Sequence, residues 1–375
     1  MPAPASKKFR VLVVDDSAFM RKVLETIFNA DEFLQVVGHA KDGREAVALA
    51  ESLKPDVITM DINMPHVDGL QATAEIMTTN PRPIVVVSSE SREGAASTLR
   101  ALELGAIEFV AKPSSGIDLD MQSVREELLR KVRMAAKVRV VRTASRVAST
   151  LRNAPTVATP QRTPLPTPVA SSGLDQRFPV VVIAASTGGP ATVMRMAPGF
   201  TADFPAAVIL VQHMPAAFTT QYTAQLAEFT SIRVKEAEPN ESLLPGVFYV
   251  CPGGQHLRVT PTGRLQLDAT SGRINGYLPN IDVTMESVAS YAGAMSIGAI
   301  LTGMGNDGAL GCQAIKRAGG LVLAQNEETC VIFGMPSEAI KLGVVDETLG
   351  IDDIYPSIEK RVLAISRVPT GAGVR

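Results

Sequence analysis

Acidic residues stand directly after apolar runs in the first third of the chain. Asp15 and Asp16 follow the run 9–14, Asp61 follows 56–60, and Lys112 follows 106–111. If the runs are neighbouring parallel strands, their carboxyl ends lie side by side and three carboxylates converge. Like charges this close repel one another, and a hard divalent cation relieves the repulsion. Mg²⁺ suits such a site because it binds a few carboxylates together with water and phosphate oxygens.

A magnesium-bound carboxylate beside a lysine can accept a phosphoryl group. Asp61 would attack the phosphoryl donor, while the ammonium of Lys112 and the hydroxyl of Ser88, at the end of the run 83–89, contact the phosphoryl oxygens. The competing interpretation is that each strand-end aspartate only caps the helix that follows. That reading is adequate for one residue alone, but the ordered set of residues favours the phosphoryl site.

A different set of residues in the second half suits acyl transfer. Ser186 stands where the apolar run 179–185 turns into Gly188-Gly189-Pro190. Proline suits a first helical turn, and the glycines let backbone N–H groups approach a ligand oxygen at a helix N-terminus. A serine beside such donors has the form of a nucleophile beside an oxyanion hole. On this motif alone, a phosphate-cradling or capping role for the serine is equally acceptable.

Two later residues favour the nucleophile. His213 follows the run 206–212, and Asp307 lies in a glycine-rich loop after the run 296–301. At neighbouring strand ends, Asp307 could orient the imidazole of His213, which would take the proton of Ser186. The order Ser, His, Asp, together with Ala184 at the first glycine position of G-x-S-x-G, excludes the α/β-hydrolase scaffold.

Several residues compete with or supplement this assignment. His256 is the alternative base and Asp282 the alternative acid, although we interpret Asp282 mainly as a helix cap. Met304 is expected near the oxyanion region, with core packing as the competing role. His39 and His66 are expected to be surface residues of the first half.

The elements that position these residues alternate between strands and helices. In the first half, apolar runs typical of buried parallel strands are separated by stretches with helical spacing of apolar residues. From residue 179 the alternation resumes, with a glycine-rich middle, 245–280, that indicates turns and a hairpin. The fold class predicted is α/β, with two doubly wound domains of mainly parallel sheets joined by a Pro-rich linker. The domains predicted are 1–130, a helical extension and linker 131–178, and 179–375.

The composition favours a globular protein of two domains and gives no sign of nucleic-acid binding. The 375 residues are 46% hydrophobic with a net charge of −2, which favours two well-filled cores and gives no reason to expect nucleic acid as a partner. Three cysteines without metal-ligand spacing indicate plain thiols. The absence of an apolar signal core and of about 20 consecutive apolar residues predicts a cytoplasmic protein. The linker, 143–172, is rich in Pro, Ala and Thr and positively charged, which suits an extended spacer, with contact to a partner as the alternative.

The first half resembles the receiver domain of two-component response regulators. The resemblance rests on VLVVDDS, DVITMDINMPHVDGL, VVVSS and GAIEFVAKP. It implies that Asp61 is the phosphoacceptor, and that Asp16, Asp61 and the backbone carbonyl of Asn63 hold the metal with support from Asp15. It also implies switch roles for Ser88, Lys112 and the aromatic Phe109.

The whole chain, apart from linker and termini, resembles the chemotaxis response-regulator protein-glutamate methylesterases. The additional stretches are AASTGGP, VQHMP, LTGMGNDG and AQNEETCVIFGMP. The resemblance implies Ser186, His213 and Asp307 as nucleophile, base and acid, with Thr187 and Met304 lining the site. It implies hydrolysis of γ-glutamyl methyl esters on membrane chemoreceptors, deamidation of receptor glutamines in many members, and a chemotaxis histidine kinase as phosphodonor. No cofactor is expected for hydrolysis.

A switch joined to an enzyme, with no third module, predicts that the unphosphorylated first half covers the cleft at Ser186. Phosphorylation of Asp61 would loosen that contact. Two alternatives stay open on the sequence. One is a response regulator whose second half only binds a partner, and the other is a hydrolase of a different ester or amide.

Overall fold

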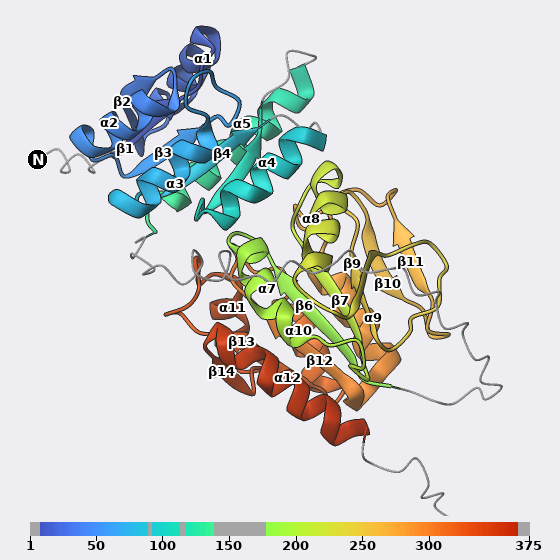
Figure 1. The fold of residues 1–375 in the computed structure, drawn as a ribbon. Coiled ribbons are helices and arrows are strands. Elements are labelled where there is room, and N and C mark those ends of the chain that lie inside the picture. Colours follow the sequence, from blue (N-terminus) through green and yellow to red (C-terminus); the bar gives the residue numbers. More distant parts are fainter. Residues whose placement is uncertain (1–7, 89–91, 113–117, 139–177, 367–375) are drawn as a thin grey trace, which may run out of the picture.

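The computed structural model describes residues 8–88, 92–112, 118–138 and 178–366. They form two α/β domains that pack against each other, which confirms the predicted fold class (Figure 1). The predicted Pro-rich linker, 143–172, lies outside the described residues. No helix in the described ranges is long and apolar enough to cross a bilayer.

The first domain has a five-stranded parallel sheet in the order β2-β1-β3-β4-β5. Its strands and helices alternate along the chain: β1 Phe9–Val14, α1 Ala18–Asn29, β2 Leu34–Ala40, α2 Gly43–Leu53, β3 Val57–Met60, α3 Gly69–Thr79, β4 Ile84–Ser88, α4 Arg92–Glu103, β5 Glu108–Ala111 and α5 Asp118–Ala135. Strands β3 and β4 are buried at every position because helices cover both faces of the sheet. All five strands were predicted, and α5 crosses the predicted domain boundary at residue 130.

The second domain has a seven-stranded sheet in the order β14-β13-β12-β6-β7-β9-β8, with every pair parallel. Its strands are β6 Val180–Ala185, β7 Ala207–Gln212, β8 Arg233–Glu236, β9 Val247–Val250, β12 Ser296–Ile300, β13 Leu321–Gln325 and β14 Glu347–Leu349, and the predicted hairpin is β10 His256–Val259 with β11 Leu265–Asp268. The helices are α7 Gly189–Met196, α8 Ala216–Glu228, α9 Ile281–Ala292, α10 Ala309–Arg317, α11 Met335–Lys341 and α12 Ile351–Ser366.

The strands that carry the candidate triad are adjacent in this sheet. Strand β6 lies between β12 and β7, and all three are buried along their whole length. Their carboxyl ends therefore open at one edge, where Ser186, His213 and the loop carrying Asp307 follow directly. The edge strands β8 and β14 and the helix α12 were not predicted.

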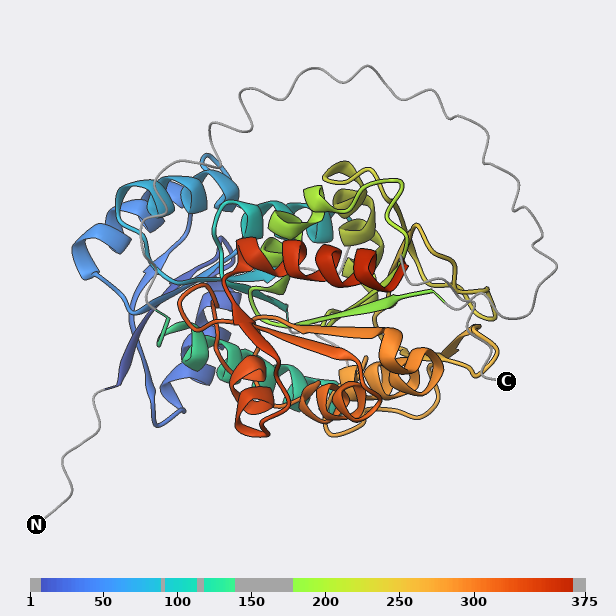
Figure 2. The same cartoon turned by 90° about the horizontal axis from the view of Figure 1, so that it is seen from below.

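The two domains share one continuous apolar core. Helix α4 of the first domain packs on α8 and α7 of the second, and buried residues from both sheets belong to a single hydrophobic cluster. The view from below shows the first domain seated beside the carboxyl edge of the second sheet (Figure 2). This placement brings the α4-β5-α5 face of the first domain to the side of the second domain on which Ser186 lies.

Candidate active site and phosphoacceptor pocket

The three triad candidates meet in one hydrogen-bonded chain. Nδ1 of His213 lies 3.1 Å from Oγ of Ser186, and Nε2 lies 2.8 Å from Oδ2 of Asp307. An imidazole whose Nε2–H donates to the carboxylate leaves Nδ1 free to accept the serine proton. The sequence placed these residues 27 and 94 positions apart along the chain, and the sheet brings them into contact.

Backbone donors fix the carboxylate of Asp307. Besides His213, it accepts hydrogen bonds from the N–H groups of Ile281 at 2.8 Å and Asp282 at 3.1 Å. These groups belong to the first turn of α9, where donors without intrahelical partners and the helix dipole stabilise an anion. Asp307 is therefore a buried but fully partnered carboxylate that holds one orientation toward the imidazole.

The turn after Ser186 supplies candidate oxyanion donors. Gly188 has a φ of +75°, which glycine adopts without strain, and a Cβ there would strike the side chain of Val331 at 2.6 Å. Within the described residues, the backbone N–H groups of Thr187 and Gly188 have no hydrogen-bond acceptor. The N–H of Gly189 instead donates to the carbonyl of Ser186 at 2.8 Å. Thr187 and Gly188 are thus the candidate donors, and Gly189 shapes the turn.

Gly189 is needed for close packing. A Cβ at this position would lie 2.2 Å from Oε1 of Gln212, whose amide nitrogen donates to the carbonyl of Ser186 at 2.8 Å. The side chain of Gln212 is buried, and its hydrogen bond holds the turn after Ser186 in place at the end of the sheet. Each glycine of the pair is therefore needed for its own reason, Gly188 because Val331 lies against it and Gly189 because Gln212 does.

The competing base and acid occupy other places. His256 is fully buried; its Nε2 donates to the carbonyl of Gly272 at 2.8 Å, and its Nδ1 accepts from the N–H of Asn280 at 3.1 Å. Both ring nitrogens are engaged, so His256 anchors backbone and is not the base. His39 and His66 are exposed, as predicted.

Asp282 caps a helix, as expected, but the helix is α10 and not its own. Asn280 is the N-cap of α9, and its side chain accepts from the N–H of Val283. Asp282 reaches instead to the first turns of α10, where Oδ1 accepts from the N–H of Gly311 at 2.7 Å. Burial, with the nearby charge of Asp307, raises the pKa of Asp282 to about 6. Its short side chain ties α9 to the helix that follows Asp307.

The acidic residues of the first domain converge as expected. Ligand oxygens of Asp15, Asp16 and Asp61 all lie within 4.8 Å of one another. Nζ of Lys112 lies 2.7 Å from Oδ2 of Asp61 and 3.1 Å from Oδ2 of Asp15. Burial raises the pKa of Asp61, while the hydrogen bond from Lys112 opposes that rise.

This cluster fits a divalent cation. Oδ2 of Asp15 is buried and, although Lys112 is near, receives no hydrogen bond of acceptable geometry in the described part of the chain. Three carboxylates and one ammonium leave an excess of negative charge at the strand ends, which a hard cation with oxygen ligands would balance. Asp15, Asp16 and Asp61 would hold the ion. The backbone carbonyl of Asn63 was expected to complete the set of ligands. Asn63 is exposed and lies two residues after Asp61 in the chain, and its role as a ligand stays a prediction.

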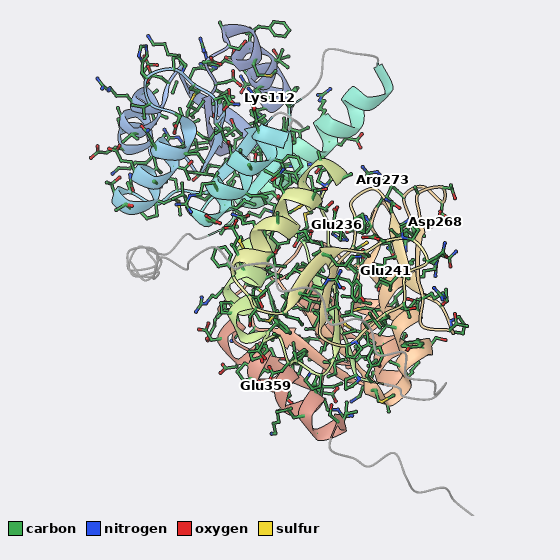
Figure 3. All side chains as sticks on the ribbon, turned by 45° about the vertical axis from the view of Figure 1, so that its right-hand side comes forward. Lys112, Glu236, Glu241, Asp268, Arg273 and Glu359 are labelled. Carbon is green, nitrogen blue, oxygen red and sulfur yellow. The ribbon has the colours of Figure 1, made fainter. Side chains whose placement is uncertain are left out.

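The switch residues lie between this pocket and the second domain. Ser88 is buried at the end of β4, where its hydroxyl contacts the carbonyl of Gly94 at 3.3 Å. Phe109 is buried and its ring packs against Phe218 of α8, with centroids 4.4 Å apart. Figure 3 shows Lys112 on the first domain, well away from the second. Phe109 thus reaches across the domain junction, whereas Lys112 faces the acidic pocket.

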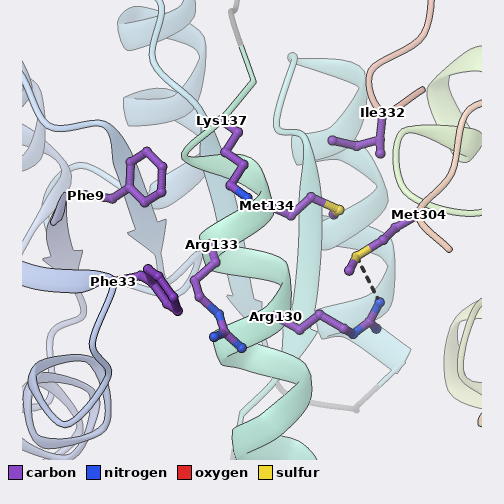
Figure 4. Close-up of a pocket in the computed structure, with 8 residues that line it drawn as sticks. All are labelled: Phe9, Phe33, Arg130, Arg133, Met134, Lys137, Met304 and Ile332. Carbon is purple, nitrogen blue, oxygen red and sulfur yellow. Dashed lines mark hydrogen bonds between the residues drawn. The ribbon is translucent and has the colours of Figure 1, made fainter. Parts of the chain in front are cut away.

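Met304 lies at the same junction. It lines a pocket together with residues of the first domain, three of them from α5, and Nη1 of Arg130 approaches its sulfur at 3.4 Å (Figure 4). The predicted place of Met304 near the oxyanion donors therefore stays a prediction. No motif or spacing in the sequence indicated its contact with Arg130.

Comparisons with known proteins agree with this architecture. A family model described as the response regulator receiver domain matches residues 11–125, and one described as CheB methylesterase matches residues 181–358. A protein from Symbiobacterium thermophilum named protein-glutamate methylesterase/protein-glutamine glutaminase is 42% identical over 95% of this chain and 98% of its own length. The chain belongs to this family.

Two further proteins are similar to this chain. A protein of the same name from Pyrococcus horikoshii is 40% identical and covers 95% of this chain and 94% of its own length. The crystal structure of the Thermotoga maritima CheB methylesterase catalytic domain is 37% identical, covers 49% of this chain and 98% of that chain, and has a TM-score of 0.47. The receiver domain of the family implies that phosphorylation regulates the protein.

Proposed function

We propose that this protein hydrolyses γ-glutamyl methyl esters on the cytoplasmic helices of chemoreceptors, giving glutamate and methanol. The observation that carries the proposal is the chain of contacts from Ser186 through His213 to Asp307. The names of the relatives supply the substrate class. The same site would deamidate glutamines, because an amide has the same acyl carbon with ammonia as its leaving group.

The geometry supports a two-step acyl transfer. Oγ of Ser186 attacks the ester carbon while Nδ1 of His213 takes its proton, and the N–H groups of Thr187 and Gly188 would stabilise the oxyanion. The imidazolium then returns that proton to the departing methoxide, and methanol leaves. Water, deprotonated by the same nitrogen, attacks the acyl-serine, and the imidazolium returns that proton to Oγ of Ser186 as the glutamyl carboxyl group leaves and ionises. Asp307 keeps the imidazole in place throughout.

The first domain would control this site. Asp61 accepts a phosphoryl group from a histidine kinase, Mg²⁺ bound at the acidic cluster would neutralise charge on the phosphoryl oxygens, and Lys112 and Ser88 would contact those oxygens. The contacts of the unphosphorylated state support inhibition by occlusion of the active site by the first domain. Glu108, at the start of β5, accepts a hydrogen bond from the hydroxyl of Thr187 at 2.6 Å, and both side chains are buried.

Glu108 is held in turn by charges of its own domain. Nζ of Lys131 lies 3.4 Å from Glu108 and 2.9 Å from Glu127, and it donates to the carbonyl of Phe109 at 2.8 Å. A buried ion cluster of this kind is costly to leave partly paired. A shift of β5 after phosphorylation would therefore disturb the cluster and the bond to Thr187 together.

The test is methanol release from methylated receptor membranes, with and without a small phosphodonor such as acetyl phosphate. We expect release by the full chain, an increase with the phosphodonor, and none from Ser186→Ala. Methanol formation by Ser186→Ala at the wild-type rate would end the serine mechanism. A wild type that labels at Ser186 with a fluorophosphonate but releases no methanol would end the substrate assignment only. Fragment 180–375 should release methanol faster than the unphosphorylated full chain. An equal or lower rate would contradict inhibition by occlusion of the active site.

A further inference from the structure

The imidazole of His213 is stacked against an aromatic ring that has no role in the triad. The ring of Tyr277 lies parallel to it, with centroids 4.6 Å apart and an interplanar angle of 15°. The side chain of His213 is only 14% exposed. Tyr277 therefore covers a face of the general base while both ring nitrogens stay free to bond within the plane.

The segment that carries Tyr277 is firmly placed. It connects β11 to α9, and Ile274 and Tyr277 exchange two backbone hydrogen bonds of 3.0 Å each. Its ends are tied to the buried His256, which bonds to Gly272 on one side and to Asn280 on the other. The stack therefore rests on a fixed piece of backbone whose anchor is the histidine that is not the base.

The phenol end of Tyr277 contacts the loop that carries Asp307. A Cβ added to Gly305 would lie 2.1 Å from the Tyr277 oxygen, and Gly305 has a φ of +91°. Only glycine lets the backbone come this close. Burial and the charge of Asp307 raise the pKa of the Tyr277 phenol, so it is neutral at physiological pH. Tyr277 thus spans from the base to the loop that holds the acid.

We propose that Tyr277 is a positioning residue for the proposed hydrolysis, acting through the imidazole of His213. Its ring holds the imidazole in the plane that contains both Ser186 and Asp307. The π face also attracts the positive charge that the imidazole gains when it takes the serine proton, an interaction that strengthens toward the transition state. The effect falls on kcat, since a group that acts through the base does not bind the ester.

This inference rests on the proposed function only for its substrate, so the experiment uses two readouts. The first is kcat and KM for methanol release from methylated receptor membranes, measured on the full chain activated with acetyl phosphate. The second is the rate at which a fluorophosphonate labels Ser186, which depends on activation by His213 and needs no receptor. If wild type labels but releases no methanol, the substrate assignment fails and the labelling rates still test Tyr277.

Tyr277→Leu removes the π face, and Tyr277→Phe keeps it. We expect the Leu variant to lose about 10-fold in kcat and in labelling rate, with KM changed less than about 2-fold. The Phe variant should stay within about 2-fold of wild type. The matched control is Tyr291→Leu, the same change near the far end of α9, which should leave both rates unaltered.

Three results would overturn the proposal. Unchanged kcat and labelling in Tyr277→Leu would show that the ring does nothing for the base. A rise confined to KM would make Tyr277 a wall of the substrate site. A Phe variant as slow as the Leu variant would assign the effect to the hydroxyl. If Tyr277→Leu loses the thermal transition of the second domain, Tyr277→Gln takes its place under the same criteria.

Discussion

Both domains place polar side chains at the carboxyl ends of parallel strands, but the two clusters differ in how complete they are. In the second domain, the carboxylate of Asp307 accepts from His213 and from two backbone N–H groups of α9. In the first domain, one ammonium pairs with Asp15 and Asp61 of a cluster of three aspartates, and a buried oxygen of Asp15 has no hydrogen bond in the described residues.

The difference corresponds to two kinds of task. A site whose base and acid are already hydrogen-bonded within the protein is organised before substrate arrives, which is what transition-state stabilisation requires. A site that carries uncompensated negative charge changes state when a cation and a phosphoryl group bind, which is what a switch requires. Under the proposed function the preorganised site needs a restraint from outside, and the hydrogen bond between Glu108 and Thr187 is the contact that we propose for it.

The largest expected effect comes from removing the nucleophile of the complete site. Ser186→Ala should lower methanol release by at least about 10⁴-fold, because the triad acts as a unit and little beyond binding and oxyanion donors remains. Phosphoryl uptake by the first domain should equal that of wild type, since Asp61 and its neighbours are untouched. A residual rate within about 10-fold of wild type would contradict the triad.

Removing the phosphoacceptor should have the reverse effect, abolishing phosphoryl uptake and leaving basal hydrolysis intact. Asp61→Asn should take up no phosphoryl group and show no activation by acetyl phosphate, while its basal methanol release stays within about 2-fold of wild type. The amide keeps the size of the side chain but is a poor nucleophile and removes one of the three charges. Activation that survives in this variant, followed by phosphate content and methanol in the same samples, would place the phosphoacceptor elsewhere.

A smaller effect is expected at the contact between the domains. Glu108→Ala should raise the basal rate of the unphosphorylated chain by about 3-fold, since it removes a buried charge-assisted hydrogen bond to Thr187 and leaves the partner of that bond in place. The comparison is with Glu75→Ala, an exposed glutamate of α3, which should leave the basal rate unchanged. A basal rate that falls or stays constant in Glu108→Ala would show that this contact does not restrain the enzyme.

The sequence predicts most of the fold because buried parallel strands have a distinctive composition. Strands such as β6 and β7 are apolar at nearly every position, and each is followed directly by a residue of the candidate triad. The edge strands β8 and β14 were missed because they are short and partly exposed, and their charged residues break the pattern. Helix α12 was missed although its apolar spacing is helical; it contains Pro356, which usually marks a boundary.

The candidate site is predicted from sequence only where residues follow strands. Ser186, His213 and Asp307 could be found because a parallel sheet orders its strand ends. Tyr277 could not, because no periodicity encodes the path of the segment between β11 and α9. Glu108 could not, because its partner Thr187 belongs to the other domain and is reached only when the two cores join.

The smallest expected effect concerns the protonation state of Asp282, the carboxylate beside Asp307. The pKa of Asp282 is raised from 3.8 to about 6, chiefly by burial. Between those pH values the native state holds a proton that the unfolded chain has released, so this group's contribution to stability is present at low pH and is lost as pH rises through about 6. Asp282→Asn keeps an oxygen for the N–H of Gly311 but cannot ionise. Its unfolding free energy should match wild type near pH 4 and exceed it by up to about 3 kcal/mol near pH 7. Urea titrations of both proteins across this range measure the difference, and a difference that does not change with pH would mean that Asp282 stays ionised beside Asp307.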